Sequence, residues 1–267
     1  MPDRFFVDKP ITGERALLEG PEAHHLLHVL RAKSGDEVVL FDDSGTEFAA
    51  RVEIVGRTTA ELAVLARTVV DRELAIEITV GAALPKGDRQ KWLVEKLTEL
   101  GVARLVPIET RRGVAQPIDA AIERLRRSVV EACKQCGRNR LMKIDTPQSI
   151  ERFLTLADSR RPRLFAHPGG ADLREEFERV RCATGSASAA AGQQSTGTAS
   201  GTRKYTGTAS GIRRSVAIAI GPEGGFTDDE AALAVAAGWR SVDLGPRILR
   251  VETAALALAV IAGLLAR

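Results

Sequence analysis

The chain has few cysteines, no long hydrophobic run and no large excess of charge of one sign. Its 267 residues include three cysteines, and this odd number excludes a disulfide framework and favours a reducing compartment. The longest apolar run, residues 254–266, covers 13 positions, fewer than the roughly 20 that span a bilayer. The first residues lack the apolar stretch of a signal peptide. We therefore expect a soluble, cytoplasmic protein with no membrane partner.

The net charge of +3 hides an asymmetry along the chain. Residues 1–70 hold 8 basic and 12 acidic side chains, whereas residues 111–140 hold 8 basic and 3 acidic ones. A basic stretch this dense favours a polyanionic partner such as RNA. The alternative is a solvated helix face with ordinary charge scatter.

The first 70 residues predict a small β-barrel. Short apolar segments with turn residues between them are typical of such barrels, and one helix over residues 21–34 interrupts the series, with Leu26, Val29 and Leu30 at helical spacing. The predicted strands cover residues 5–7, 15–18, 37–42, 46–55 and 59–66.

After about residue 72, apolar strands alternate with amphipathic helices, which predicts an α/β fold with a mainly parallel sheet. One helix begins near Asp88 and ends at Gly101, a residue type that commonly closes helices. Another follows Pro117 and carries its basic residues largely off the apolar face. The predicted strands cover residues 76–84, 105–108, 163–166, 216–220 and 242–244.

Residues 185–214 interrupt this alternation. Gly, Ala, Ser and Thr fill 22 of the 30 positions, and a ten-residue segment is duplicated there. This composition buries too little apolar surface to offset its ordering entropy, so we expect a flexible insertion. The basic residues within it leave a functional arm as the alternative.

Two short patterns suggest metal or redox chemistry without establishing it. His24 and His28 lie four apart on one helix face, but the sequence has no HExxH arrangement and no evident third ligand. Cys133 and Cys136 form a CxxC pair in the middle of a predicted helix, with no second pair. We therefore expect a structural or interface role for the histidines, core cysteines, and no metal site.

Two glycine-rich loops each follow a predicted strand, where open α/β sheets bind their ligands. In the first, GPEGG at 221–225 precedes a Thr227–Glu230 capping box that opens a helix. In the second, Gly-Pro at 245–246 precedes Arg247, Arg250 and Glu252. The loops predict one pocket, and because Glu223 would repel phosphate, a cationic or neutral ligand suits it better.

The segments GPEGGFTDDE and LGPRILRVETAAL resemble the SPOUT-superfamily methyltransferases of the RsmE type, which methylate N3 of a uridine in 16S ribosomal RNA. ALPKGDRQKWLVEKLTELGV, EACKQCGR, RFFV and HHLLHVLRAKSGDEVVLFD extend the resemblance over most of the chain. It implies a PUA-like RNA-binding barrel over residues 1–72, a methyltransferase domain over residues 73–267 with a deep trefoil knot, and a homodimer that takes part in ribosome biogenesis.

The resemblance also implies a pocket for S-adenosylmethionine. Removal of the uracil N3 proton builds negative charge on the flanking oxygens, which Arg247 or Arg250 could stabilise. Glu252 is a candidate proton acceptor, or it orients an arginine. The residues expected to bind the cofactor are Ala166, His167, Ile220, Gly221, Pro222, Glu223, Gly224, Gly225, Leu244, Gly245, Ile248, Leu249 and Thr253.

For RNA, we expect Arg4 to contact the substrate from the barrel and Arg111, Arg112, Arg138 and Arg140 to contact phosphates. Two alternatives stay open. One is a methyltransferase of the same fold that acts on another RNA position, such as a ribose 2′-oxygen. The other is a non-catalytic RNA-binding assembly protein.

Overall fold

The computed structural model describes residues 2–113, 119–156, 161–185 and 214–264. The chain divides into two compact units, Met1–Glu73 with Val130–Leu141, and Leu74–Val129 with Met142–Arg267. The predicted insertion at 185–214 lies outside the described residues except for its two ends. Gly185 is the last residue of one helix, and Arg214 is the first residue of a strand.

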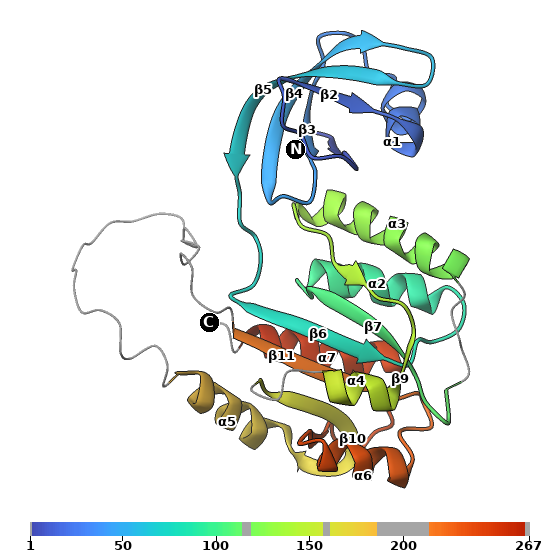
Figure 1. The fold of residues 1–267 in the computed structure, drawn as a ribbon, viewed down its shortest axis with the longest axis vertical. Helices are drawn as coiled ribbons and strands as arrows, with labels where there is room; N and C mark the ends of the chain where they lie inside the picture. The colour runs from blue at the N-terminus through green and yellow to red at the C-terminus, as the bar shows by residue number, and fades with distance from the viewer. Residues whose placement is uncertain (1, 114–118, 157–160, 186–213, 265–267) are drawn as a thin grey trace, which may run out of the picture. The chain divides into compact units, whose positions relative to one another are not determined.

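The first unit is built on a curled five-stranded sheet in the order β1-β3-β4-β5-β2 (Figure 1). Strands β1 and β3 run parallel and the other pairs antiparallel. Alternate side chains such as Phe5, Leu40 and Leu62 are fully buried and form its core. All five predicted strands are confirmed, and they span Arg4–Phe6, Arg15–Leu18, Glu37–Phe41, Thr46–Val55 and Ala60–Val69.

The helix predicted over residues 21–34 is shorter and less regular than its pattern suggests. An α-helix, α1 (Gly20–His24), begins with Pro21 and passes directly into a π-helical turn, η1 (His25–Val29). Arg31 then adopts a left-handed backbone conformation with φ of 55°. The helical segment therefore ends before Arg31, at a residue type that rarely adopts this conformation.

The CxxC pair lies in the last turn of helix α3 (Asp119–Cys136), not in the middle of a helix as predicted. Cys133 is fully buried, as expected for a core cysteine, and burial raises the pKa of its thiol to about 12. Cys136 is half-buried. The described residues contain no group of three metal-ligating side chains.

The second unit contains a parallel sheet in the order β12-β10-β11-β6-β7-β8, with β9 also paired to β7 (Figure 1). This confirms the predicted α/β class. Residues such as Ile78, Leu105 and Ile218 are fully buried, as is typical of parallel strands covered on both faces. The strands are β6 (Ile76–Ala82), β7 (Arg104–Glu109), β8 (Lys143–Ile144), β9 (Gln148–Ser149), β10 (Arg163–Asp172), β11 (Arg214–Ile220) and β12 (Arg240–Asp243).

Helices cover this sheet. Helix α7 (Val251–Leu264) packs on β6, β11 and α2 (Arg89–Glu99), whereas α4 (Ile150–Leu156) packs on β7 and α6 (Asp228–Ala236). Helix α5 (Leu173–Gly185) contacts β10 and β12. Sequence reasoning missed β8, β9 and α4, which are too short to carry a periodic pattern.

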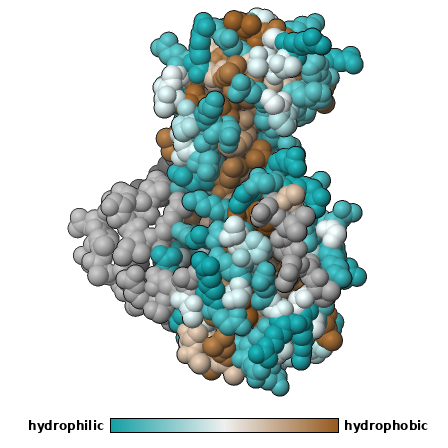
Figure 2. Space-filling view, turned by 45° about the vertical axis from the view of Figure 1, so that its right-hand side comes forward, coloured by the Kyte–Doolittle hydropathy of each residue, from teal (hydrophilic) through white to brown (hydrophobic). Residues whose placement is uncertain are grey.

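None of the described helices combines the length and the apolar character that a membrane crossing needs. The face seen in Figure 2 is mainly hydrophilic, with patches of apolar side chains between the polar ones.

Candidate active site

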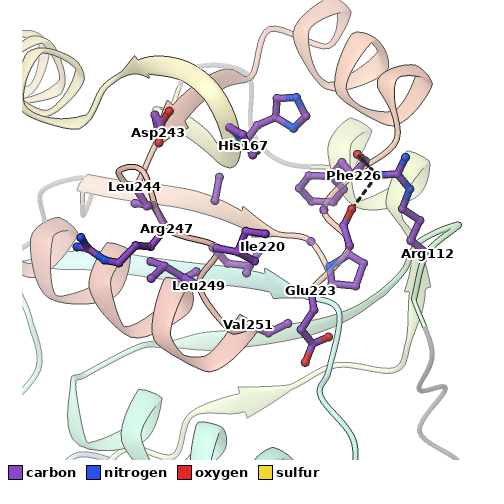
Figure 3. A pocket seen from close by; sticks show the side chains of 18 of the residues that line it. Arg112, His167, Ile220, Glu223, Phe226, Asp243, Leu244, Arg247, Leu249 and Val251 are labelled. Atoms are coloured by element: carbon purple, nitrogen blue, oxygen red, sulfur yellow. Dashed lines mark hydrogen bonds between the residues drawn. The ribbon is translucent and has the colours of Figure 1, made fainter.

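The irregular middle of β10 and the carboxyl ends of β11 and β12 lie at one edge of the parallel sheet and surround a cavity of about 430 Å³ (Figure 3). Such edges are where open α/β sheets bind ligands. The lining residues are Arg112, Ala166, His167, Pro168, Ile220, Gly221, Pro222, Glu223, Gly224, Gly225, Phe226, Asp228, Asp243, Leu244, Gly245, Pro246, Arg247, Ile248, Leu249, Val251 and Ala254.

The loop after β11 forms one wall of the cavity. A hydrogen bond from the Gly225 backbone N–H to the Pro222 carbonyl (2.8 Å) closes a tight turn. Gly225 has φ of 69°, a conformation that L-residues other than glycine rarely adopt. A Cβ at Gly221 would lie 3.1 Å from the Phe226 nitrogen. The glycines therefore let the backbone itself line the cavity.

The predicted capping box follows this loop and is confirmed. The Thr227 N–H donates to Glu230 Oε2 (2.7 Å), and the Glu230 N–H donates to Thr227 Oγ1 (3.3 Å). Glu230 is buried and also accepts a hydrogen bond from the Arg111 N–H (2.8 Å). The capping box thus fixes both the start of α6 and the end of the glycine-rich loop.

Asp243 joins two walls of the cavity, and sequence reasoning missed it. Its carboxylate accepts hydrogen bonds from the Gly169 N–H (2.9 Å) and the Gly245 N–H (2.8 Å). These bonds, that from Gly169 foremost, lower the pKa of Asp243 below its usual value. The available signal was an aspartate at the end of a strand, directly before a Gly-Pro loop.

A chain of charged groups lies beside the first loop. Arg89 Nη1 donates to Glu223 Oε1 (3.0 Å) and lies 3.6 Å from Glu252 Oε1. The pKa of Glu223 is lowered, first by a hydrogen bond from its own backbone N–H and further by Arg89. Glu252 is buried, and its Oε2 has no hydrogen-bond partner among the described residues. Because its pKa is lowered, Glu223 carries a negative charge at neutral pH.

The cavity brings together the predicted cofactor residues of all three strands, with one exception. Thr253 is exposed on α7 and does not line the cavity. Of the three predicted catalytic residues, Arg247 lines the cavity, whereas Arg250 and Glu252 do not. The binding and catalytic roles of these residues stay predictions.

Arg111 and Arg112 differ in what they contact. Arg111 is exposed and pairs with Asp229 (2.7 Å). Arg112 Nη1 donates to the carbonyls of Gly224 (2.7 Å) and Phe226 (3.4 Å), so its side chain lines the cavity (Figure 3). The structure thus places Arg112 with the glycine-rich loop, and its role as a phosphate contact stays a prediction.

The basic residues of the first unit differ in the same way. Arg138 is buried and donates to both oxygens of Glu73 (3.0 and 2.5 Å), and Arg4 donates to Glu47 and Asn139 (2.6 Å each). These guanidinium groups are held inside the unit by the bonds to Glu47, Asn139 and Glu73, and the phosphate contacts expected of Arg4 and Arg138 stay predictions. Arg140 is exposed and remains available. A count of charges in the sequence cannot distinguish buried from exposed arginines.

Comparison with known proteins defines the class. A family model described as an RNA methyltransferase domain matches residues 72–263, and one described as an RNA methyltransferase PUA domain matches residues 18–65. The fold and the match together define an RNA methyltransferase with a PUA domain.

Individual relatives narrow this class. Proteins named ribosomal RNA small subunit methyltransferase E from Synechocystis and Mycobacterium bovis are each 31% identical to this chain. The alignments cover 91% and 94% of this chain and 71% and 87% of the relatives. The chain belongs to the ribosomal RNA small subunit methyltransferase E family.

Two solved structures have a similar fold. A Legionella pneumophila methyltransferase in complex with S-adenosylmethionine is 27% identical, with a TM-score of 0.77 over 100% of this chain and 97% of that one. A ribosomal RNA small subunit methyltransferase E from Neisseria gonorrhoeae, bound to S-adenosylmethionine, is 25% identical, with a TM-score of 0.79 over 99% and 98%.

Proposed function

We propose that this protein transfers the methyl group of S-adenosylmethionine to N3 of a uridine in 16S ribosomal RNA. The observation that carries the proposal is the cavity at the middle of β10 and the ends of β11 and β12, lined by the GPEGG and GPRIL loops. The Legionella and Neisseria proteins of similar fold have S-adenosylmethionine bound. The name shared by the relatives supports small-subunit ribosomal RNA as substrate.

The chemistry of the cavity fits this cofactor. Its volume of about 430 Å³ is in the range of small-molecule sites. The glycines at 221 and 225 expose backbone groups, and Ile220, Leu244 and Leu249 supply apolar walls. The carboxylates of Glu223 and Asp243 are compatible with a cation and would repel a phosphate.

When bound, S-adenosylmethionine supplies a methyl group on a positively charged sulfur. The loops at 220–226 and 243–249 would hold it, so much of the catalysis is positioning of the two reactants. The uridine N3 proton must leave, and negative charge then develops on the flanking carbonyl oxygens. Arg247, exposed at the cavity, would stabilise that charge, with exposed Arg250 as a second candidate.

For Glu252, we propose a positioning role rather than proton transfer. It does not line the cavity, it is buried, and its nearest charged partner is Arg89 at 3.6 Å. Through Arg89 it would steady Glu223 on the glycine-rich loop.

We also propose that the protein is a homodimer that uses α7. Val260 and Leu264 lie four residues apart on this helix and are 44% and 55% exposed, and Trp92 on the adjoining α2 is 45% exposed. A second copy that covers these side chains would bury apolar surface. Sedimentation should show a dimer, and Val260→Glu should shift it toward monomer.

The knot, the domain division and the location in the cell belong to the same proposal. Strand β12 lies at the edge of the sheet, yet α7, the next element, returns to β6 and β11. This path supports a deep trefoil knot in residues 73–267, beside an RNA-binding barrel over residues 1–72. A substrate within the small ribosomal subunit would place the protein in the cytoplasm.

Two experiments test the function. Calorimetry on the purified protein should show binding of S-adenosylmethionine, and absence of binding would favour an RNA-binding assembly protein. Mass mapping of 16S nucleosides after deletion of the gene should show loss of one N3-methyluridine. Loss of a 2′-O-methylated nucleoside instead would transfer the activity to ribose.

A further inference from the structure

The segment from Glu22 to Arg31 in the first unit has one face fixed in the core. Ala23 and Leu26 are fully buried, and the His25 ring lies 5.8 Å from the ring of Phe5. Glu22 accepts hydrogen bonds from the Phe6 N–H (3.2 Å) and from Lys134 (3.1 Å). The segment is therefore anchored to β1 and to the end of α3.

Its opposite face carries aromatic and apolar groups in solvent. His24 and His28 are both exposed, and their rings lie 4.9 Å apart at an interplanar angle of 47°. Val29 and Leu30, which follow, are 59% and 39% exposed. The π-helical turn at His25–Val29 lies within this segment, and such turns occur frequently at functional sites.

Arg31 adds a strained and available cation. Its φ of 55° is uncommon for a residue other than glycine. Hydrogen bonds from Leu30 N to His25 O and from Ala32 N to Leu26 O (3.0 Å each) hold the backbone around it. The Arg31 side chain is exposed, and no described residue accepts a hydrogen bond from it. The left-handed backbone thus occurs at an arginine whose side chain is exposed.

We propose that His24, His28 and Arg31 form a binding platform for single-stranded RNA. Bases stack on the two imidazole rings, and the Arg31 guanidinium contacts the RNA backbone. Histidine and arginine planes are established stacking partners of unpaired bases. This platform rests on the proposed function, which makes RNA the substrate.

Charge favours stacking over electrostatic attraction at this place. The first 70 residues hold 12 acidic and 8 basic side chains, and because this net negative charge does not attract phosphates, RNA binding at this place depends on stacking. A metal site is disfavoured because two imidazoles alone are too few ligands for a metal ion, and the described residues offer no group of three metal-ligating side chains.

The test uses the full-length protein, a labelled oligouridine of about 12 nucleotides and fluorescence anisotropy under one fixed buffer condition. His28→Ala should weaken binding about five- to 150-fold, the range measured for loss of one stacked base. His28→Phe, which keeps an aromatic face, should bind nearly as wild type. Leu65→Ala, at another exposed apolar position of the same unit, is the matched control.

Arg31→Gly isolates the guanidinium, because glycine adopts the left-handed conformation without strain. It should keep or raise thermal stability and flatten the salt dependence of binding by about 0.7 units of slope per lost phosphate contact. Arg57→Ala removes another exposed arginine of the first unit and should leave the slope unchanged.

Wild-type affinity in His28→Ala, or equal losses in His28→Phe and His28→Ala, would overturn the stacking platform. If His28→Ala fails to fold, the Phe variant and Arg31→Gly still decide the matter. Binding of S-adenosylmethionine should be unchanged in all variants. If the wild-type protein does not bind S-adenosylmethionine, the proposed function is overturned instead.

Discussion

Replacing Gly225 with alanine tests whether the left-handed turn builds the cofactor cavity. Gly225 has φ of 69°, and a Cβ built there meets no atom within 4 Å. The substitution therefore adds backbone strain without a steric clash inside the protein. Its neighbour Gly224 is the matched control, because it has no left-handed φ and its Cβ would make an ordinary 3.4 Å contact with the flexible Arg112 side chain.

The expected magnitude follows from the conformation. A left-handed backbone costs an L-residue about 1–2 kcal/mol relative to glycine. If the loop of the unliganded protein relaxes to avoid this strain, the whole cost appears on binding and weakens the affinity for S-adenosylmethionine about five- to 30-fold. If the loop is rigid, the same cost appears as a lower free energy of unfolding. Gly224→Ala should change either quantity by less than about threefold or 0.7 kcal/mol.

Calorimetry with S-adenosylmethionine and denaturant unfolding should be measured together on Gly225→Ala, Gly225→Asn and Gly224→Ala. Asparagine is larger than alanine but tolerates the left-handed region better. Backbone strain therefore predicts tighter binding by Gly225→Asn than by Gly225→Ala, whereas a clash with the cofactor predicts the reverse order.

Two results would refute this reasoning. One is a Gly225→Ala protein with both wild-type affinity and wild-type unfolding free energy, which would mean that the left-handed turn carries no cost. The other is a larger loss of affinity or stability in Gly224→Ala than in Gly225→Ala, which would mean that Gly224, and not Gly225, carries the conformational constraint.

Three further predictions follow from contacts in the two units. Asp243→Ala should destabilise the protein most at neutral pH. Because the folded-state pKa of Asp243 is lowered, its carboxylate stabilises the folded protein above about pH 4, and this stabilisation is lost as the pH falls through the folded-state pKa. The unfolding free energies of the wild type and Asp243→Ala should therefore converge in acid. A difference between them that stays constant with pH would contradict this prediction. Arg138→Met should cost about 3–5 kcal/mol in urea unfolding, because it leaves Glu73 buried and unpaired, whereas exposed Arg140→Ala should cost little. Arg112→Ala should weaken the binding of S-adenosylmethionine about fivefold, because the bond to the Gly224 carbonyl is lost, and should leave the salt dependence of RNA binding unchanged. Unchanged cofactor binding together with a flatter salt dependence would instead support Arg112 as a phosphate contact.

Local patterns in the sequence were sufficient for the regular elements and for the position of the cavity. The apolar run at 216–220, the GPEGG loop and the Thr227–Glu230 capping box depend on residues within a few positions of one another. Parallel strands end at the same edge of a sheet, so the strand-end loops could be assigned to one pocket before their contacts were known.

Partners that are distant in the chain were decided only by the tertiary structure. Asp243 accepts its hydrogen bond from a glycine 74 residues away, and Arg89 reaches Glu223 across 134 residues. Strands β8 and β9 have two residues each and form because β7 offers them a hydrogen-bonding edge.

Charge shows the same division. The sequence alone determined that residues 111–140 are basic, but folding buried Arg138 against Glu73, placed Arg112 in the cavity and left Arg140 exposed. A guanidinium group binds whichever carboxylate or carbonyl the fold brings within reach, and that proximity is a property of the packed chain, not of the local sequence.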